Sequence, residues 1–180
     1  MTDLIGVEQI TGHGFSQHID RLAVLLNACV NGGASVGFIT PHTTADSRAY
    51  WEKAVRPGVT SGSKLLFIAI ADHVIAGTVQ LDISMFPNQR HRAEVGKLLV
   101  DPGFRRRGIG CLLMNTLEQK AHELGRRLLT LDTITGSPAE SLYRTLGFMP
   151  AGEIPDYARD PLEDRLDPTL FMYKSLKHHT

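Results

Sequence analysis

Cysteine and net charge are both scarce in this sequence. Only two cysteines, Cys29 and Cys111, occur among the 180 residues. Both stand among apolar neighbours within helical patterns, which predicts buried free thiols and excludes a disulfide framework. Lysine and arginine number 19, as do aspartate and glutamate. No overall field therefore favours nucleic acid or an acidic membrane, and neither is an expected partner.

Several familiar segments and motifs are also missing. No apolar run approaches membrane-spanning length, and no basic segment followed by an apolar one opens the chain, so a cytoplasmic location is expected. No Gly-Lys-Ser/Thr closes a P-loop after Gly103 or Gly108, and no third glycine of a dinucleotide fingerprint follows Gly110. Gly-x-Ser-x-Gly does not occur. The eight histidines lack metal-ligand spacing, so no metal is expected.

The most informative stretch present is residues 94–124. It reads as an apolar strand, a turn, a basic loop and a helix, over residues 94–100, 101–104, 105–108 and 109–124. Helical spacing of apolar residues ends at Gly125, a residue suited to a helix C-cap. The first N–H groups of a helix lack internal partners and carry partial positive charge. Gly108, Gly110 and three consecutive arginines let a phosphorylated ligand approach that point.

The rest of the chain divides into strand-like and helix-spaced segments. Further helices are expected at residues 15–30, 44–56 and 138–146, and strands at 4–11, 65–71, 74–83, 91–100, 127–133, 148–154 and 169–176. The second helix is expected to end before Pro57, and residues 155–167 are expected to form a polar loop. No repeat or linker interrupts the pattern, which predicts one α+β domain over residues 1–180 with a mixed sheet.

Two motifs give this pattern a family resemblance. Arg-x-x-Gly-x-Gly at 105–110, after Leu-x-Val-x-Pro at 98–102, resembles the acetyl-CoA signature of the GNAT superfamily of N-acetyltransferases. A second motif, formed by Ala139, Tyr143, Gly147 and Phe148, resembles the other sequence hallmark of the same family. The resemblance covers about residues 4–176 and implies the GNAT fold, which is α+β with a mixed, mostly antiparallel sheet of about seven strands and helices on both faces. Within the superfamily, segments 32–38, 88–97, 131–133 and 136–137 look most like the tabtoxin-resistance subfamily.

The resemblance implies acetyl-CoA as co-substrate. In the family, the pyrophosphate lies over the loop's N–H groups, here 106–111. The pantetheine arm pairs with the preceding strand, here 98–100, where it diverges from the next strand. An unpaired strand edge matches the amides of that arm. The implied binding residues are Leu98, Leu99, Val100, Arg105, Arg106, Arg107, Gly108, Ile109, Gly110, Cys111, Ser137 and Tyr143. Ser137 stands near the position where many members carry an asparagine.

The reaction implied is direct attack of a neutral amine on the thioester in a ternary complex. An aliphatic ammonium has a pKa of about 10, so a base must remove its proton at neutral pH. Tyr143 matches the family position of the acid that protonates the departing thiolate; a packed tyrosine is the ordinary alternative. Glu94 and Asp132 are both candidates for the base. Each has an equally good ordinary explanation: Glu94 as an exposed charge at the end of a strand, and Asp132 as a turn former. Strand alternation places Glu94, Gly96, Leu98 and Val100 on one face.

The acceptor site is expected between the first two helices, the loop after Ser84 and residues 153–167. Possible wall residues are Tyr50, Trp51, Phe86, Glu153, Asp156 and Tyr157. The predicted acceptor is a primary amine of a small molecule, such as an amino-acid-like toxin or antibiotic. A protein N-terminus or lysine is an alternative acceptor, and an acyl-CoA-binding paralogue without catalysis is a second alternative. A homodimer through the final strands is compatible with the sequence.

Overall fold

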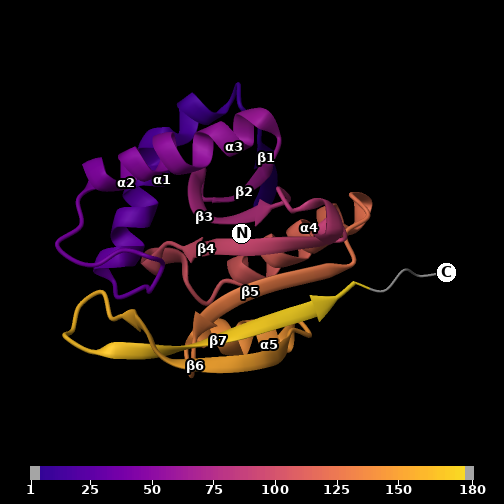
Figure 1. Cartoon of the computed structure of the whole chain (residues 1–180). Coiled ribbons are helices and arrows are strands. Elements are labelled where there is room, and N and C mark those ends of the chain that lie inside the picture. Colours follow the sequence, from indigo (N-terminus) through magenta and orange to yellow (C-terminus); the bar gives the residue numbers. More distant parts are fainter. Residues whose placement is uncertain (1–4, 177–180) are drawn as a thin grey trace.

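A seven-stranded sheet forms the centre of the molecule. The computed structural model describes residues 5–176, with the strands in the order β1-β2-β3-β4-β5-β7-β6 (Figure 1). Every neighbouring pair is antiparallel except β4 and β5, which run parallel. The predicted α+β class, with a mixed and mostly antiparallel sheet and helices on both faces, is confirmed.

The elements follow the predicted order. The strands are β1 Gly6–Ile10, β2 Lys64–Ala71, β3 Val74–Asp82, β4 Arg92–Val100, β5 Leu128–Ile134, β6 Met149–Arg159 and β7 Leu166–Ser175. The α-helices are α1 Phe15–Asn31, α2 Thr44–Tyr50, α3 Arg56–Ser61, α4 Ile109–Glu123 and α5 Pro138–Thr145. A π-helical turn, Trp51–Val55, joins α2 to α3, and 3-10 turns form at Pro87–Gln89 and Pro102–Phe104. None of the helices within residues 5–176 is long and apolar enough to span a bilayer.

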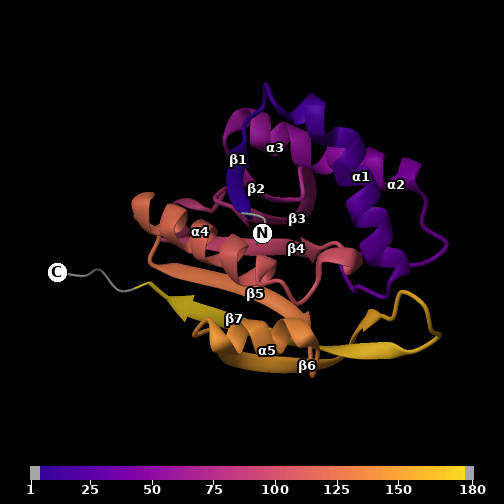
Figure 2. The ribbon, with the colours of Figure 1, turned by 180° about the vertical axis from the view of Figure 1, so that it is seen from behind.

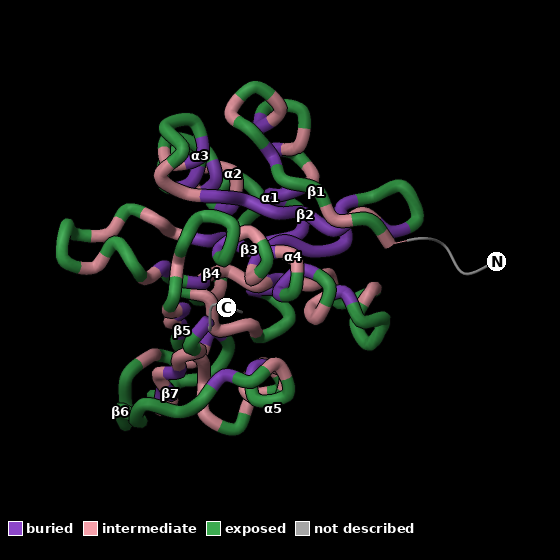
Figure 3. Tube along the Cα trace, turned by 90° about the vertical axis from the view of Figure 1, so that its right-hand side faces the viewer, coloured by how far each residue is buried: buried purple, intermediate pink, exposed green. Residues whose placement is uncertain are grey.

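The two faces of the sheet carry separate apolar cores. Leu66 and Ile68 of β2 face α1, α3 and the π turn, whereas Leu65 and Phe67 face α4, as the two-residue period of a strand requires. Figure 2 shows α4 and α5 lying across this second face. Burial is concentrated in the central strands, and β6 is exposed along nearly its whole length (Figure 3). The apolar packing therefore fixes β2 to β5, which carry the site.

The predicted end of the second helix is wrong. The helical path continues through the π turn into α3 and stops at Gly62, whose φ is 74°. Pro57 lies in the first turn of α3, a position where a proline is tolerated because the N–H it lacks would have had no intrahelical acceptor. The wider π turn lets the helix restart there instead of breaking.

The predicted polar loop at residues 155–167 is also wrong. Strand β6 runs to Arg159 and β7 begins at Leu166, so the two strands form a long hairpin. Strand β6 is the sheet edge, which is where Pro150 and Pro155 can be accommodated without breaking a ladder on both sides. At the tip, Arg165 is held by Asp160 at 2.6 Å and Asp167 at 2.8 Å.

One of the two cysteines differs from expectation. Cys29 is buried, as predicted, and its thiol lies 3.5 Å from the carbonyl oxygen of Val100. Burial raises the pKa of that thiol to about 11. Cys111 is only half-buried, because it stands in the first turn of α4. Its predicted burial is therefore wrong.

Close packing of α4 on β3 gives a prediction about stability. A Cβ added to Gly77 of β3 would lie 2.9 Å from Ile109 Cγ2 and 2.9 Å from the carbonyl oxygen of Leu99. Neither neighbour can move freely, so Gly77→Ala is expected to lower the free energy of unfolding by about 1–3 kcal/mol in urea titrations. Gly152→Ala on β6 is the control, since its Cβ would meet no atom within 4 Å, and no measurable loss is expected. Equal losses in both variants would contradict the packing argument.

Candidate active site

The central parallel strands separate after a short paired segment. Strands β4 and β5 pair at Arg92↔Leu128, Ala93↔Leu129 and Glu94↔Thr130. Beyond Glu94 they diverge, as Figure 1 shows, while β5 continues to pair with β7 as far as Ile134. The second half of β4 therefore presents N–H and C=O groups on the side facing the split between the two strands. Such an edge can pair with an extended ligand that carries amides.

A bulge in β4 changes which side chains face the split. The register shifts between Gln80↔Gly96 and Thr78↔Leu99, so β4 holds one residue more than β3 over this stretch. Lys97 has a φ of 51°, a conformation uncommon for a residue other than glycine. One extra residue with a local kink defines a β-bulge.

The predicted shared face of β4 is wrong because of this bulge. Leu98 and Val100 pack against the core under α4, and Leu99 packs against the core under α1. Ala93 and Val95 are buried in the α4-side core, so Glu94 between them faces the α1 side. Glu94 thus lies on the face opposite Leu98 and Val100, since the inserted residue reverses the alternation.

The loop before α4 has the geometry of an anion site. Gly108 is the N-cap of α4, with a φ of 79° and no side chain to bond the first turn. The N–H groups at Ile109, Gly110 and Cys111 therefore have no intrahelical acceptor, and the helix dipole adds positive charge. A Cβ built on Gly108 meets no atom within 4 Å, which leaves room above the backbone. Buried Ile109 anchors the turn, so these N–H groups are held in place at the start of the helix.

The three arginines of the loop have different surroundings. Arg107 pairs with Asp72 of the β2–β3 turn at 2.8 Å, and its guanidinium lies 5.2 Å from the Phe104 ring centroid. Arg105 is exposed and close enough to Cys29 to lower the pKa of its thiol, against the larger effect of burial. Arg106 is exposed and has a φ of 65°. Arg105 and Arg106 are therefore the exposed arginines next to the cradle for which no ion pair is described among residues 5–176, whereas the charge of Arg107 is offset by Asp72.

Tyr143 lies on α5 beneath the split. The ring packs in the α4-side core, with its centroid 5.7 Å from that of Phe148, and only 6% of the residue is exposed. Burial raises the pKa of the Tyr143 phenol well above its usual range, and the Asp132 carboxylate raises it further. Helix α5 is fixed by its cap, because Ser137 Oγ accepts from the Glu140 N–H at 3.2 Å. That oxygen also lies 3.2 Å from Thr133 Oγ1.

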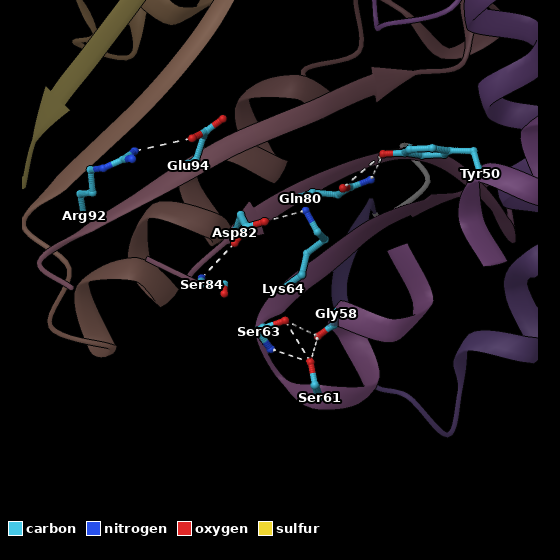
Figure 4. A network of polar contacts seen from close by, with 10 residues as sticks. All are labelled: Tyr50, Gly58, Ser61, Ser63, Lys64, Gln80, Asp82, Ser84, Arg92 and Glu94. Carbon is cyan, nitrogen blue, oxygen red and sulfur yellow. Dashed lines mark hydrogen bonds and ion pairs between the residues drawn. The ribbon is translucent and has the colours of Figure 1, made fainter. Parts of the chain in front are cut away.

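The two candidate bases occupy different parts of the split. Asp132 is exposed on β5, two residues beyond the last β4–β5 pair. Its charge has a secondary effect, after burial, on the pKa of both Tyr143 and Lys97. Glu94 stands where the strands are still paired; its side chain is 55% exposed and lies 3.6 Å from Arg92 (Figure 4). Asp132 is therefore the carboxylate placed within the split.

A polar cluster on the α1 side of the sheet was not predicted from the sequence. The Tyr50 hydroxyl meets Gln80, with 3.2 Å between oxygen and Nε2, and Lys64 pairs with Asp82 at 3.0 Å (Figure 4). The Lys97 ammonium lies 5.9 Å from the centroid of the Tyr50 ring. Gln80, between the apolar residues Val79 and Leu81, was the available signal. Tyr50 was a predicted wall residue, and this cluster places it beside the split.

The other predicted wall residues are scattered. Trp51 is fully buried and donates from Nε1 to the Leu22 carbonyl oxygen at 2.9 Å. Its prediction as a wall residue is wrong, because the π turn directs the indole into the core under α1. Phe86 is highly exposed after β3, and the rest lie exposed along β6: Glu153, Asp156 and Tyr157.

Two distant segments meet at the open end of the split. The N–H and the hydroxyl of Thr40 both donate to the Pro161 carbonyl oxygen, at 2.9 and 2.7 Å. This contact joins the loop before α2 to the tip of the β6–β7 hairpin, and the two lie side by side in Figure 1. A Cβ on Gly37 of the same loop would lie 3.8 Å from Lys97 Nζ. The loop and the hairpin thus border the space beside the split.

Comparisons with known proteins agree with this geometry. A model described as the acetyltransferase (GNAT) family matches residues 20–148. An uncharacterised N-acetyltransferase of Methanocaldococcus jannaschii is 37% identical over 75 residues, which span 40% of this chain and 33% of that protein. A candidate acetyltransferase of Salmonella typhimurium, solved with acetyl-CoA, superimposes with a TM-score of 0.74 at 17% identity over 98% of this chain and 96% of its own. A candidate phosphinothricin N-acetyltransferase superimposes with a TM-score of 0.77 at 17% identity. The match covers 97% of this chain and 100% of that protein's chain.

Proposed function

The chain belongs to the GNAT family of acetyltransferases, and we propose that it transfers the acetyl group of acetyl-CoA to a primary amine of a small molecule. The observation that carries this proposal is the split beyond the Glu94↔Thr130 pair, next to the uncapped start of α4. The split offers backbone groups to an amide-bearing arm, and the helix start offers N–H groups to a pyrophosphate. One ligand with both parts fits the two features together.

The loop and strand residues would hold the co-substrate in the following way. The N–H groups from Arg106 to Cys111 bind the pyrophosphate, with the three arginines around them. Residues 98–100 pair with the pantetheine arm through their backbone, so Leu98, Leu99 and Val100 keep packing in the two cores. Ser137 lies at the start of α5 beside the same split. Bound acetyl-CoA supplies a thioester carbonyl that an amine can attack.

Two side chains would move the protons. Asp132 accepts a proton from the acceptor ammonium, because it is the carboxylate within the split. Tyr143 donates its phenol proton to the departing thiolate, and its raised pKa keeps that proton in place at neutral pH. Glu94 is the less favourable base, since it lies at the paired end of the strands and faces Arg92. The nitrogen loses its second proton as the tetrahedral intermediate collapses, and this proton replaces the one that Tyr143 gave. The products are the amide, the thiol of CoA and one proton, which passes from Asp132 to solvent.

Two likenesses support a small, amino-acid-like acceptor. The Thr40–Pro161 contact also joins a loop and a hairpin tip beside the split, where residues of both could contact a small molecule. The structural likeness to a candidate phosphinothricin N-acetyltransferase and the resemblance to the tabtoxin-resistance subfamily both support a toxin or antibiotic as acceptor. Two free cysteines and the use of acetyl-CoA are consistent with a cytoplasmic reaction.

A thiol-release screen with acetyl-CoA tests this function. The panel contains amino acids, amino-acid-like antibiotics, polyamines, peptides with free N-termini and lysine peptides. We expect release of CoA with one or more small amines, and a reaction without acceptor corrects for labelling of the half-buried Cys111. Release with peptides alone would replace the small-molecule acceptor with a protein. Binding of acetyl-CoA by calorimetry without any release would indicate a non-catalytic binding protein, and no binding would contradict the proposal.

A further inference from the structure

Lys97 is a half-buried cation whose ammonium makes no ion pair with the described part of the chain. In residues 5–176, no carboxylate oxygen lies within 4.0 Å of its Nζ, whereas the neighbouring Lys64 pairs with Asp82 at 3.0 Å. The bulge in β4 gives Lys97 a φ of 51°, so the fold holds this residue in an uncommon conformation. Burying a charge without a partner is unfavourable. An arrangement of this kind favours an anionic ligand that supplies the missing charge.

The surroundings of Lys97 place that ligand beside the reacting amine. Its ammonium lies 5.9 Å from the Tyr50 ring centroid, and a Cβ on Gly37 would be 3.8 Å from it. Burial lowers the pKa of Lys97, Asp132 raises it and Lys64 lowers it. Lys97 on β4 and Asp132 on β5 both lie beyond the last β4–β5 pair, so the two strands that border the split carry opposite charges there. A molecule with an ammonium and an anionic group on one short carbon skeleton matches both.

We propose that Lys97 binds the carboxylate of the acceptor, so that the site selects amino acids whose amine lies at Asp132. This inference rests on the proposed function, since it assigns the class of the acceptor. Lys97 determines specificity and takes no proton in the reaction. The aromatic ring of Tyr50 shields one side of the ammonium from water, which strengthens its interaction with a carboxylate.

Kinetics with paired acceptors test this role. Each amino acid that supports thiol release is compared with its carboxamide, which keeps the amine and loses the negative charge. We expect Lys97→Met to raise KM for the amino acid by about 10- to 150-fold, the range for a charge-assisted hydrogen bond, with little change in kcat. KM for the carboxamide is expected to stay the same. Lys97→Arg should restore most of the difference, and exposed Lys53 provides the control Lys53→Met.

A loss of kcat that is equal for the acid and its carboxamide, and that Lys97→Arg does not restore, would overturn the proposal. It would indicate that Lys97 takes part in proton transfer or holds the bulge. Unfolding temperatures of both variants separate these results from a failure to fold, and the Lys97→Arg comparison remains informative if the methionine variant is unstable.

A binding measurement separates this inference from the proposed activity. N-acetyl derivatives of the twenty common amino acids and their carboxamides are added to the CoA-bound protein, and the unfolding temperature is recorded. We expect one or more carboxylates, but not the matching carboxamides, to raise it, and Lys97→Met to abolish the rise. That result without any thiol release would support the anion site and contradict the activity. Equal shifts with acids and carboxamides would overturn the anion site whatever the activity.

Discussion

Replacing Tyr143 by phenylalanine is expected to lower kcat by about 100- to 10,000-fold, the range for loss of a general acid. KM for acetyl-CoA should change by less than about threefold, because the hydroxyl acts on the departing thiolate and not on the bound thioester. Phenylalanine keeps the ring that packs against Phe148, with 5.7 Å between the centroids. Stopped-flow or steady-state thiol release measures both constants.

The pH dependence of the wild-type enzyme follows from the same residue. Burial, followed by the Asp132 charge, raises the pKa of Tyr143. The phenol therefore stays protonated at every pH below the ordinary tyrosine value of about 10. Consequently, kcat should show no alkaline fall from loss of this proton between about pH 7 and 10. An alkaline fall of kcat centred within that range, and absent from Tyr143→Phe, would contradict the assignment of Tyr143 as the acid.

Tyr173→Phe on β7 is the matched control for Tyr143→Phe. Tyr173 is half-buried and lies outside the split, so its variant should keep kcat within about twofold, which corresponds to less than about 0.5 kcal/mol of barrier. The unfolding temperatures of the two variants should be similar. If Tyr143→Phe retained most of the wild-type kcat, Tyr143 would be a packing residue.

Elements with one buried face were predictable from the sequence. Helix α4 was expected at 109–124 and spans Ile109–Glu123, because its apolar residues at helical spacing face the sheet. The hairpin of β2 and β3 was expected for a similar reason, since both strands are buried nearly throughout. The predicted helix start at residue 109 also agrees with the observed N-cap at Gly108, where a residue tolerant of positive φ fits well.

Elements whose structure depends on distant partners were not predictable. The strand predicted at 148–154 matches only the first part of β6, and its continuation to Arg159 was missed. This part of β6 is exposed and gains its hydrogen bonds from β7, so it carries no apolar period to recognise. The bulge at Lys97 depends on the register between β3 and β4, which one strand's sequence does not specify. That single residue reversed the expected face of Glu94. The contact between Lys97 and Tyr50 could not be predicted either, because it depends on the bulge and the two residues are far apart in the chain.

Replacing Asp132 by asparagine is the second change with a large expected effect. At pH 7 we expect kcat/KM for the acceptor to fall by about 100-fold, the lower end of the range for loss of a general base. The loss should shrink as the pH rises toward the pKa of the acceptor amine, about 10, because solvent then removes the proton that Asp132 would have taken. The slope of log kcat/KM against pH should approach one over this range.

Glu94→Gln is the matched comparison, since it neutralises the other carboxylate at the β4–β5 pair. Glu94 is 55% exposed and faces Arg92 at 3.6 Å, so its loss should change kcat/KM by less than about threefold, within the range of an exposed ion pair. A fall in Glu94→Gln with recovery at high pH would assign the base to Glu94 instead. A pH-independent fall in Asp132→Asn would make Asp132 a positioning residue.

The charge of Asp132 has a second consequence that separates these outcomes. It raises the pKa of Lys97, so Asp132→Asn should lower the pKa of the Lys97 ammonium, measured by NMR of the labelled side chain. Glu94→Gln should leave that pKa unchanged, because Asp132 and Lys64 are the charges that act on it. A lower pKa of Lys97 in Asp132→Asn, together with recovery of the rate at high pH, would show that Asp132 is the base and that it lies close to Lys97 in one site. No shift would mean that the two charges are too far apart to bind one amino acid.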